Sequence, residues 1–100
     1  MKQTACVEAR IPVLIFQEGR KVVAYSPAID LSTFGNTEAQ ARKRFAEAAE
    51  MFFEEIAEMG TLENVLLECG WRKASKKSQW SPPVFKGCSE EPVLIPAGGC

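Results

Sequence analysis

The junction Phe34-Gly35-Asn36-Thr37 constrains the fold of this chain more than any other stretch, because short strand-like runs end there and a long helical pattern begins. Gly35 predicts a turn and Thr37 is a favourable helix N-cap. Gln40 follows three residues later, as a capping box requires. The junction therefore predicts an α+β chain in which strands lead directly into a helix.

The first predicted strand is long and covers residues 4–16. Its odd positions from Ala5 to Ile15 are all apolar, which predicts one face that is buried throughout. Pro12 has no backbone N–H group, so it indicates an edge position or a bulge near the middle of the strand.

Two further strands are predicted before the helix. Residues 17–20 form a tight hairpin turn in which Gly19 takes positive φ. A returning strand at 21–26 ends at Pro27, and a shorter strand covers 29–34. Short links between consecutive strands predict a three-stranded antiparallel β-meander.

The longest helical pattern covers residues 37–59, and Gly60 is its predicted C′ residue. Arg42 falls inside the apolar face and is expected to extend its guanidinium group to solvent. The apolar arc, roughly 100° wide, consists of Ala41, Phe45, Ala48, Ala49, Phe52, Ile56 and Met59.

Two other surfaces of this helix are candidates for partner contacts. Beside the arc lies an apolar shoulder, wider than contact with one sheet needs: Ala46, Phe53 and Ala57. The opposite side is acidic: Glu47, Glu50, Glu54 and Glu58. These carboxylates face solvent and lack an apolar pocket that would shift their pKa, so a structural role is the simpler interpretation than acid–base or metal chemistry.

A short helix and a small ribbon follow. Thr61 is the predicted cap of a helix at 62–69, which Gly70 ends. Two short β segments with one Trp each then predict a C-terminal β-ribbon. Residues 92–96 suggest one last short strand.

Composition predicts one domain over residues 1–100, with a core at 4–70 and a ribbon and tail at 71–100. The first seventy residues carry a net charge of −4 and the last thirty a net charge of +3. Histidine is absent, which removes His-dependent catalytic triads and imidazole acid–base chemistry. No glycine-rich phosphate loop is visible, so we expect a protein that is not an enzyme and needs no cofactor.

No signal peptide and no apolar run of membrane-spanning length is visible, so we expect a cytoplasmic protein without a membrane partner. Its cysteines should then be reduced. Cys6 and Cys69 fit small core positions, whereas Cys88 and Cys100 fit exposed thiols. A zinc site made of the four cysteines is the less favoured alternative, because no closely spaced ligand pair is present.

A β-meander followed by a helix is also the first half of an RNase H-like nuclease fold. Such a nuclease needs several carboxylates that hold two metal ions. The predicted strands offer only Glu8 and Asp30. The sequence thus predicts a nuclease-like shape without nuclease residues.

The tail suggests a separate binding surface. Its aromatic and basic side chains resemble a single-stranded nucleic-acid surface, although two Trp rings on a ribbon also commonly cap a small core. The candidate ribbon surface consists of Trp71, Arg72, Lys73 and Trp80, with Lys76 and Lys77 in the turn.

In order and spacing, the chain resembles the HicB-like antitoxin family over residues 7–72 and, more loosely, the tail. The segments that carry the resemblance are IPVLI at 11–15, AYSP at 24–27, GNT at 35–37, the Ala- and Glu-rich helix, LLECGW at 66–71, WSPP at 80–83 and VLIPA at 93–97.

This resemblance implies a partial RNase H-like fold and a role without catalysis. Members of the family bind HicA, a small mRNA-cleaving toxin, and neutralise it by covering its active site. An acidic chain suits a partner that binds RNA and is therefore basic. The acidic helix side is then a candidate contact with a HicA-like toxin, and the apolar shoulder a candidate contact in a homo-oligomer, either a dimer or a tetramer.

The tail departs from many family members, which append a helix-turn-helix or ribbon-helix-helix domain. Residues 71–100 show neither pattern, so direct DNA binding is not expected. The alternative function is a stand-alone oligomeric domain that binds RNA or a small ligand through the Trp- and Lys-bearing ribbon.

Overall fold

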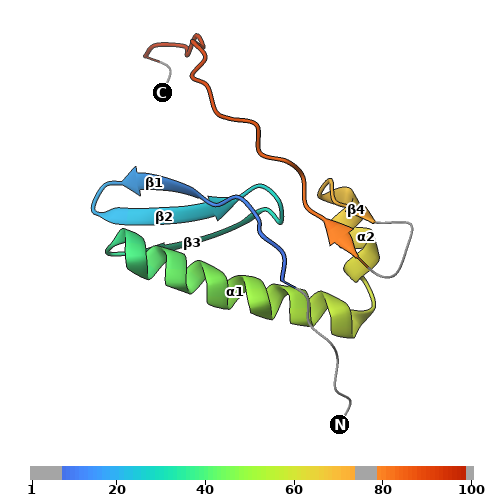
Figure 1. Ribbon diagram of the computed structural model, residues 1–100. Coiled ribbons are helices and arrows are strands. Elements are labelled where there is room, and N and C mark those ends of the chain that lie inside the picture. Colours follow the sequence, from blue (N-terminus) through green and yellow to red (C-terminus); the bar gives the residue numbers. More distant parts are fainter. Residues whose placement is uncertain (1–7, 74–78, 99–100) are drawn as a thin grey trace.

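The computed structural model describes residues 8–73 and 79–98, and the fold is α+β (Figure 1). Three strands form an antiparallel sheet in the order β1-β2-β3, and α1 packs against β3 and β2. A two-stranded antiparallel ribbon follows the helices. The elements are β1 (Leu14–Glu18), β2 (Lys21–Ser26), β3 (Leu31–Gly35), α1 (Glu38–Met59), α2 (Leu62–Glu68), β4 (Arg72–Lys73) and β5 (Trp80–Ser81).

The β1–β2 hairpin has the predicted tight turn. Glu18 pairs with Lys21, which leaves Gly19 and Arg20 as a two-residue loop. Gly19 has φ of 60°, a conformation that glycine adopts without steric cost. The turn sets the register of the sheet, since in a hairpin the loop length determines which residues pair.

The first strand is much shorter than predicted. It begins at Leu14, which pairs with Tyr25 near the end of β2, so residues before Val13 have no strand to pair with. Ile11 and Val13 still pack against the core, but Ile15 is 37% exposed because α1 covers mainly β2 and β3. The strand was predicted at 4–16 with one face buried throughout; for the described residues 8–13 this was wrong, and residues 4–7 lie outside the described residues.

The third strand begins two residues later than predicted. Ile29 lies in the turn after β2, where it is 3% exposed. The Ser26 hydroxyl accepts a hydrogen bond from the Ala28 N–H at 3.2 Å, and Asp30 has φ of 53°. This turn buries apolar side chains while it reverses the chain.

Gly35 is the last residue of β3 rather than a turn residue, and it pairs with Val22. A Cβ atom at this position would lie 2.9 Å from the Ala41 nitrogen and 2.9 Å from the Gln40 side-chain oxygen. The glycine is therefore required because the first turn of α1 passes directly over the end of the strand.

The N-terminus of α1 is capped as predicted. The Thr37 hydroxyl accepts a hydrogen bond from the Gln40 N–H at 3.1 Å. The Gln40 side chain accepts a bond from the N–H of Asn36 at 2.7 Å, one residue before its usual capping-box partner. Two donors at the helix start are thus satisfied by local side chains.

The predicted apolar arc of α1 is buried or half-buried, with one exception. Met59 is 65% exposed, because the last turn of α1 extends past the sheet (Figure 1). Arg42 is exposed and lies 3.8 Å from Glu38. The core cluster joins α1 to the sheet, the β2–β3 turn and α2: Ala24, Ala28, Ile29, Ala41, Phe45, Ala49, Leu66 and Trp71.

The helix α2 ends at Glu68 and buries Leu66, as its pattern predicts. Gly60 ends α1 with φ of 74°. The predicted side-chain cap at Thr61 is absent: its hydroxyl instead donates to the Ile56 carbonyl oxygen at 3.5 Å. The chain turns so sharply here that this hydroxyl points back to α1.

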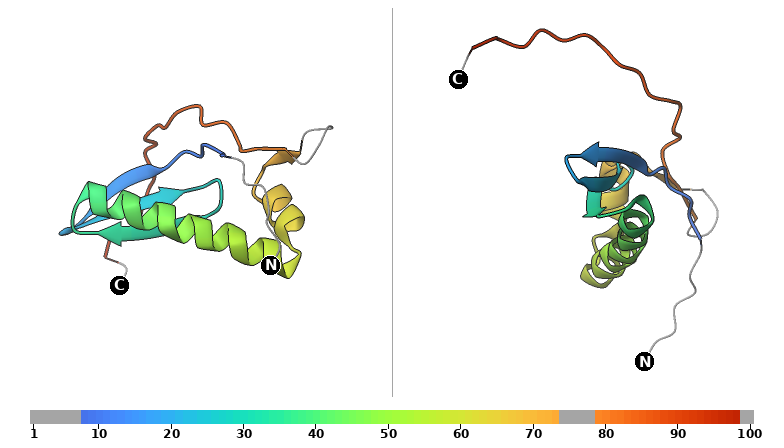
Figure 2. Two further views of the ribbon diagram at one scale, coloured as in Figure 1. Left: turned by 60° about the horizontal axis from the view of Figure 1, so that its bottom comes forward. Right: turned by 90° about the vertical axis from the view of Figure 1, so that its left-hand side faces the viewer.

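The strand predicted at 92–96 does not form, and the chain beyond β5 is extended without regular structure (Figure 2). Val93, Leu94 and Ile95 are 78%, 101% and 81% exposed. The radius of gyration is 16.8 Å, whereas a compact chain of this length has about 13 Å. The tail therefore projects away from the body.

Candidate interaction surfaces

The acidic side of α1 is exposed along its length. Glu47, Glu50, Glu54 and Glu58 are spaced three or four residues apart, which places them in one stripe along the helix. Among the described residues none of the four is in an ion pair. Met51, 67% exposed, lies beside this acidic stripe. The surface thus combines free carboxylates with one apolar side chain.

The apolar shoulder is partly used inside the chain. Phe53 is half-buried, and its ring packs edge-on against Trp71 with centroids 5.9 Å apart and against Phe52 at 5.4 Å. Ala46 and Ala57 are exposed. The shoulder is wide because α1 packs on the Trp71 segment as well as on the sheet, and two small alanines remain as its open part.

Trp71 does not lie on the ribbon surface, which corrects the predicted placement. Its side chain is 4% exposed, and the indole N–H donates to the Ala28 carbonyl oxygen at 2.8 Å. Gly70 has φ of 92°, which turns the chain after α2 and directs Trp71 into the core. Trp71 therefore covers the core, which is the alternative role expected of a Trp residue on such a ribbon.

The other ribbon residues are more accessible. Arg72 and Lys73 are exposed and Trp80 is half-buried. The Lys73 ammonium lies 3.2 Å from a Glu63 carboxylate oxygen and 5.7 Å from the centre of the Trp80 ring. The ribbon therefore presents one accessible aromatic ring instead of two. Lys76 and Lys77 lie outside the described residues.

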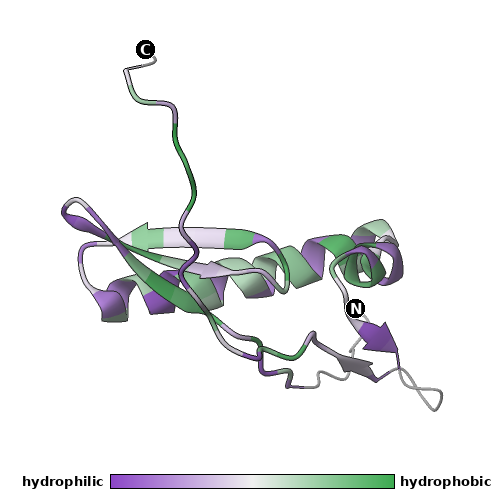
Figure 3. Ribbon diagram, turned by 90° about the horizontal axis from the view of Figure 1, so that it is seen from above, coloured by the Kyte–Doolittle hydropathy of each residue, from purple (hydrophilic) through white to green (hydrophobic). Residues whose placement is uncertain are grey.

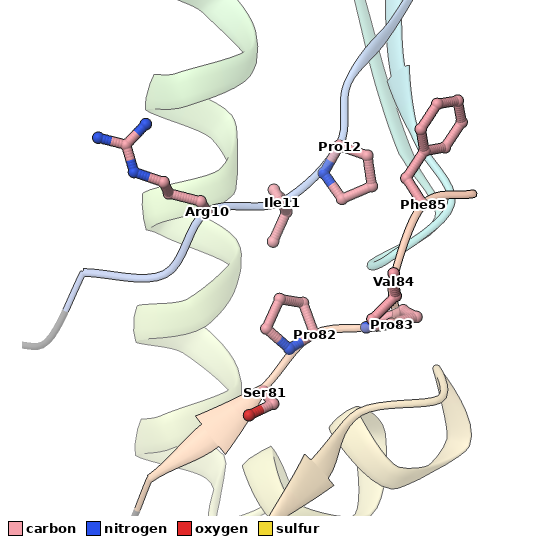
Figure 4. Close-up of a pocket in the computed structure, with 8 residues that line it drawn as sticks. All are labelled: Arg10, Ile11, Pro12, Ser81, Pro82, Pro83, Val84 and Phe85. Atoms are coloured by element: carbon pink, nitrogen blue, oxygen red, sulfur yellow. The ribbon is translucent and has the colours of Figure 1, made fainter. Parts of the chain in front are cut away.

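An open apolar groove of about 530 Å³ lies between the segment before β1 and the segment after β5 (Figure 4). Sequence reasoning missed it, although three prolines at its lining were a usable signal of rigid, extended chain. The lining offers apolar contact and one guanidinium group: Arg10, Ile11, Pro12, Ser81, Pro82, Pro83, Val84 and Phe85.

A neighbouring hollow of about 490 Å³ is lined by both described cysteines, Cys69 and Cys88. The predicted core position of Cys69 is confirmed only in part, because its side chain is half-buried. Cys88 is exposed, as predicted. Burial raises the pKa of the Cys69 thiol, and the carboxylates of Asp30 and Glu68 raise it further. Cys6 and Cys100 lie outside the described residues.

Asp30, in the β2–β3 turn, also makes a side-chain hydrogen bond to the central strand β2. It accepts a hydrogen bond from the Tyr25 hydroxyl at 3.0 Å, and this bond raises the pKa of Tyr25.

Within residues 8–73 and 79–98, no group of three or more Asp, Glu or Cys side chains is placed to hold a metal ion. None of the described helices has the length and apolarity needed to cross a membrane.

No protein-family model, no curated protein and no solved structure matches this chain.

Proposed function

We propose that this chain acts as an antitoxin that binds a HicA-like, mRNA-cleaving toxin and covers its active site. The observation that carries the proposal is the exposed acidic stripe of α1, Glu47, Glu50, Glu54 and Glu58, on a helix whose opposite side is anchored in the core. The role requires a rigid, complementary surface and no catalytic group.

Charge supports a basic partner. A toxin that binds RNA carries a positive surface, and four carboxylates without ion pairs among the described residues are free to meet it. Such contacts accelerate association and orient the partner. They also compete directly with the phosphates of RNA for the same basic groups, so binding excludes the substrate.

Met51 adds an apolar side chain to this charged surface. Complementary charge alone contributes little net affinity, whereas a desolvated apolar side chain at the centre of a contact commonly contributes more. Met51 is exposed and borders the stripe, and its flexible thioether adapts to an irregular surface. We infer that it inserts between the basic side chains of the toxin.

The test is binding to a purified HicA-like toxin by calorimetry, together with the toxin's cleavage of an mRNA fragment. We expect one antitoxin chain per toxin to suppress cleavage. The triple variant Glu47→Lys/Glu50→Lys/Glu54→Lys should weaken binding at least about 100-fold, because reversing the charge places like charges opposite each other, which costs several kcal/mol. Met51→Ala, made separately, should also weaken binding, because it removes the apolar side chain without adding a charge.

Glu68→Lys is the matched control. It makes the same charge change at an exposed carboxylate of α2, outside the stripe. If Glu68→Lys and Glu50→Lys weakened binding equally, the stripe would not be the contact. If several such toxins failed to bind the unaltered chain while the chain bound RNA oligonucleotides, the ribbon function would replace the antitoxin function.

A further inference from the structure

The C-terminal tail ends in an apolar arm, residues 89–98, that packs on none of the described elements (Figures 1 and 2). Its centre, Val93-Leu94-Ile95, is almost fully exposed. Pro92 and Pro96 flank this centre and keep the chain extended rather than helical. In Figure 3 the arm stands out as an apolar stretch held away from the body. Three large apolar side chains in water indicate a missing partner surface.

One edge of the three-stranded sheet, at β1, is open to such a segment. Among the described strands β1 pairs only with β2, so its outer edge has free N–H and C=O groups. Ile15 and Phe16 point to opposite faces of this strand and are 37% and 50% exposed. An edge strand with exposed apolar side chains is a template for pairing with another chain.

We propose that the arm of a second copy of this chain pairs antiparallel with β1 and forms a fourth strand of the sheet. In this position Val93 and Ile95 lie beside the β1 side chains on one face of the sheet, and Leu94 lies beside those on the other face. Prolines are acceptable at the ends of a new edge strand. Antiparallel pairing also brings the acidic Glu90 and Glu91 towards Arg20 of the β1–β2 turn.

The direction of the arm favours a second copy over self-pairing. Phe85, Gly87 and Cys88 share a cavity with Pro12 and Leu14, so the tail passes the start of β1. From there it leads away from its own sheet (Figure 2). Antiparallel pairing with its own β1 would need the arm to reverse. Two copies related by a two-fold axis instead exchange arms, and each edge is covered once.

The test is the mass of the full chain in solution, by light scattering or sedimentation equilibrium. We expect a dimer, twice the chain mass of 11.0 kDa. Val93→Asp/Ile95→Asp should raise the dimer dissociation constant at least about 30-fold. Because both side chains are exposed, far-UV circular dichroism should show that the variant still folds. Phe16→Lys, at the receiving edge, should have the same effect.

Two controls locate the contact. Val84→Asp places a charge on an equally exposed apolar residue of the tail, and Phe34→Lys places one on a 54% exposed ring at the far strand, β3. Neither should change the mass. An equimolar mixture of the Val93→Asp/Ile95→Asp and Phe16→Lys variants should form a heterodimer, because one intact arm then meets one intact edge.

A monomeric full chain would overturn the proposal, as would a dimer that survives the arm variant. A dimer lost in both Phe16→Lys and Phe34→Lys would assign the contact to the open face of the sheet, where the two rings lie in one cross-strand row with Val23. The exchange uses none of the acidic stripe, so Glu47→Lys/Glu50→Lys/Glu54→Lys should keep the dimer. Failure of dimerisation therefore leaves toxin binding unaffected, and the reverse also holds.

Discussion

Cys69 and Cys88 line the same hollow but differ in their chemistry. Cys88 is exposed, whereas Cys69 is half-buried beside acidic groups. Burial and the charges of Asp30 and Glu68 disfavour the Cys69 thiolate, which raises the pKa of this thiol. Since the thiolate is the nucleophile, Cys69 is the less reactive of the two at neutral pH.

Alkylation by iodoacetamide, followed by peptide mass spectrometry, checks this difference for each cysteine separately. At neutral pH, Cys88 should react faster than Cys69. The rate at Cys69 should rise only at more alkaline pH, because a raised pKa moves thiolate formation in that direction. Asp30→Asn removes one of the charges and should move the Cys69 profile back towards lower pH. Equal rates at the two thiols at neutral pH would contradict the assignment.

At the scale of elements, two threonines illustrate what a sequence signal can and cannot predict. Thr37 and Thr61 each stand within two residues after a glycine and directly before a helical pattern. Only Thr37 has an extended backbone, with φ of −134°, that lets its hydroxyl reach the N–H of Gln40. The backbone of Thr61 has φ of −108° and ψ of 6°, and its side chain makes no cap bond.

Thr37→Ala should therefore destabilise the fold by about 1 kcal/mol, the usual contribution of a helix N-cap. Thr61→Ala is the matched control and should cost less than about 0.5 kcal/mol, since its hydroxyl makes only one long bond. Urea unfolding followed by circular dichroism, at matched protein concentrations, measures both. A Thr61→Ala loss as large as that of Thr37→Ala would contradict this difference between the caps.

At the scale of the whole molecule, Trp71 joins parts of the chain that are far apart in sequence. Its indole bonds Ala28 in the β2–β3 turn, and its ring packs edge-on against Phe53 of α1. The residue itself lies between the end of α2 at Glu68 and the start of β4 at Arg72. Sheet, long helix and C-terminal segment thus meet at one side chain.

Trp71→Phe keeps an aromatic ring but leaves the buried Ala28 carbonyl oxygen without its donor. We expect a loss of about 1–3 kcal/mol in the free energy of unfolding, measured by urea titration. Trp80→Phe is the control: its ring is half-buried and contacts the Lys73 ammonium, an interaction that contributes about 0.5–1 kcal/mol at such sites. If Trp80→Phe were the more damaging change, the core would not be organised around Trp71.

The elements were largely predictable because their signals are local. The hairpin at Gly19, the strand Lys21–Ser26, the cap at Thr37 and the end of α1 at Gly60 each depend on residues a few positions apart. The strand predicted from residue 4 depended on a partner strand that ends at Ser26. Alternating apolar residues indicate an extended chain, but they do not supply a neighbour for it.

The candidate surfaces also divide into one that helical spacing predicted and others that depended on how the elements pack. The acidic stripe, Glu47, Glu50, Glu54 and Glu58, is exposed as its helical spacing predicts. The shoulder at Phe53 and the ring of Trp71 were expected on surfaces, but they pack against each other inside the chain. Periodicity places a residue on a face of its own element, and only the packing of elements decides whether that face is covered.

The sequence by itself determined the α+β class, the meander, the capped long helix and its acidic side, because hydrophobic period, turn residues and capping residues act over short distances. Only the tertiary structure decided that Gly35 is needed for close approach of α1, that Trp71 is core, and that the Val93–Ile95 arm has no partner within the described chain. Those outcomes depend on contacts between segments remote in sequence, which no local pattern encodes.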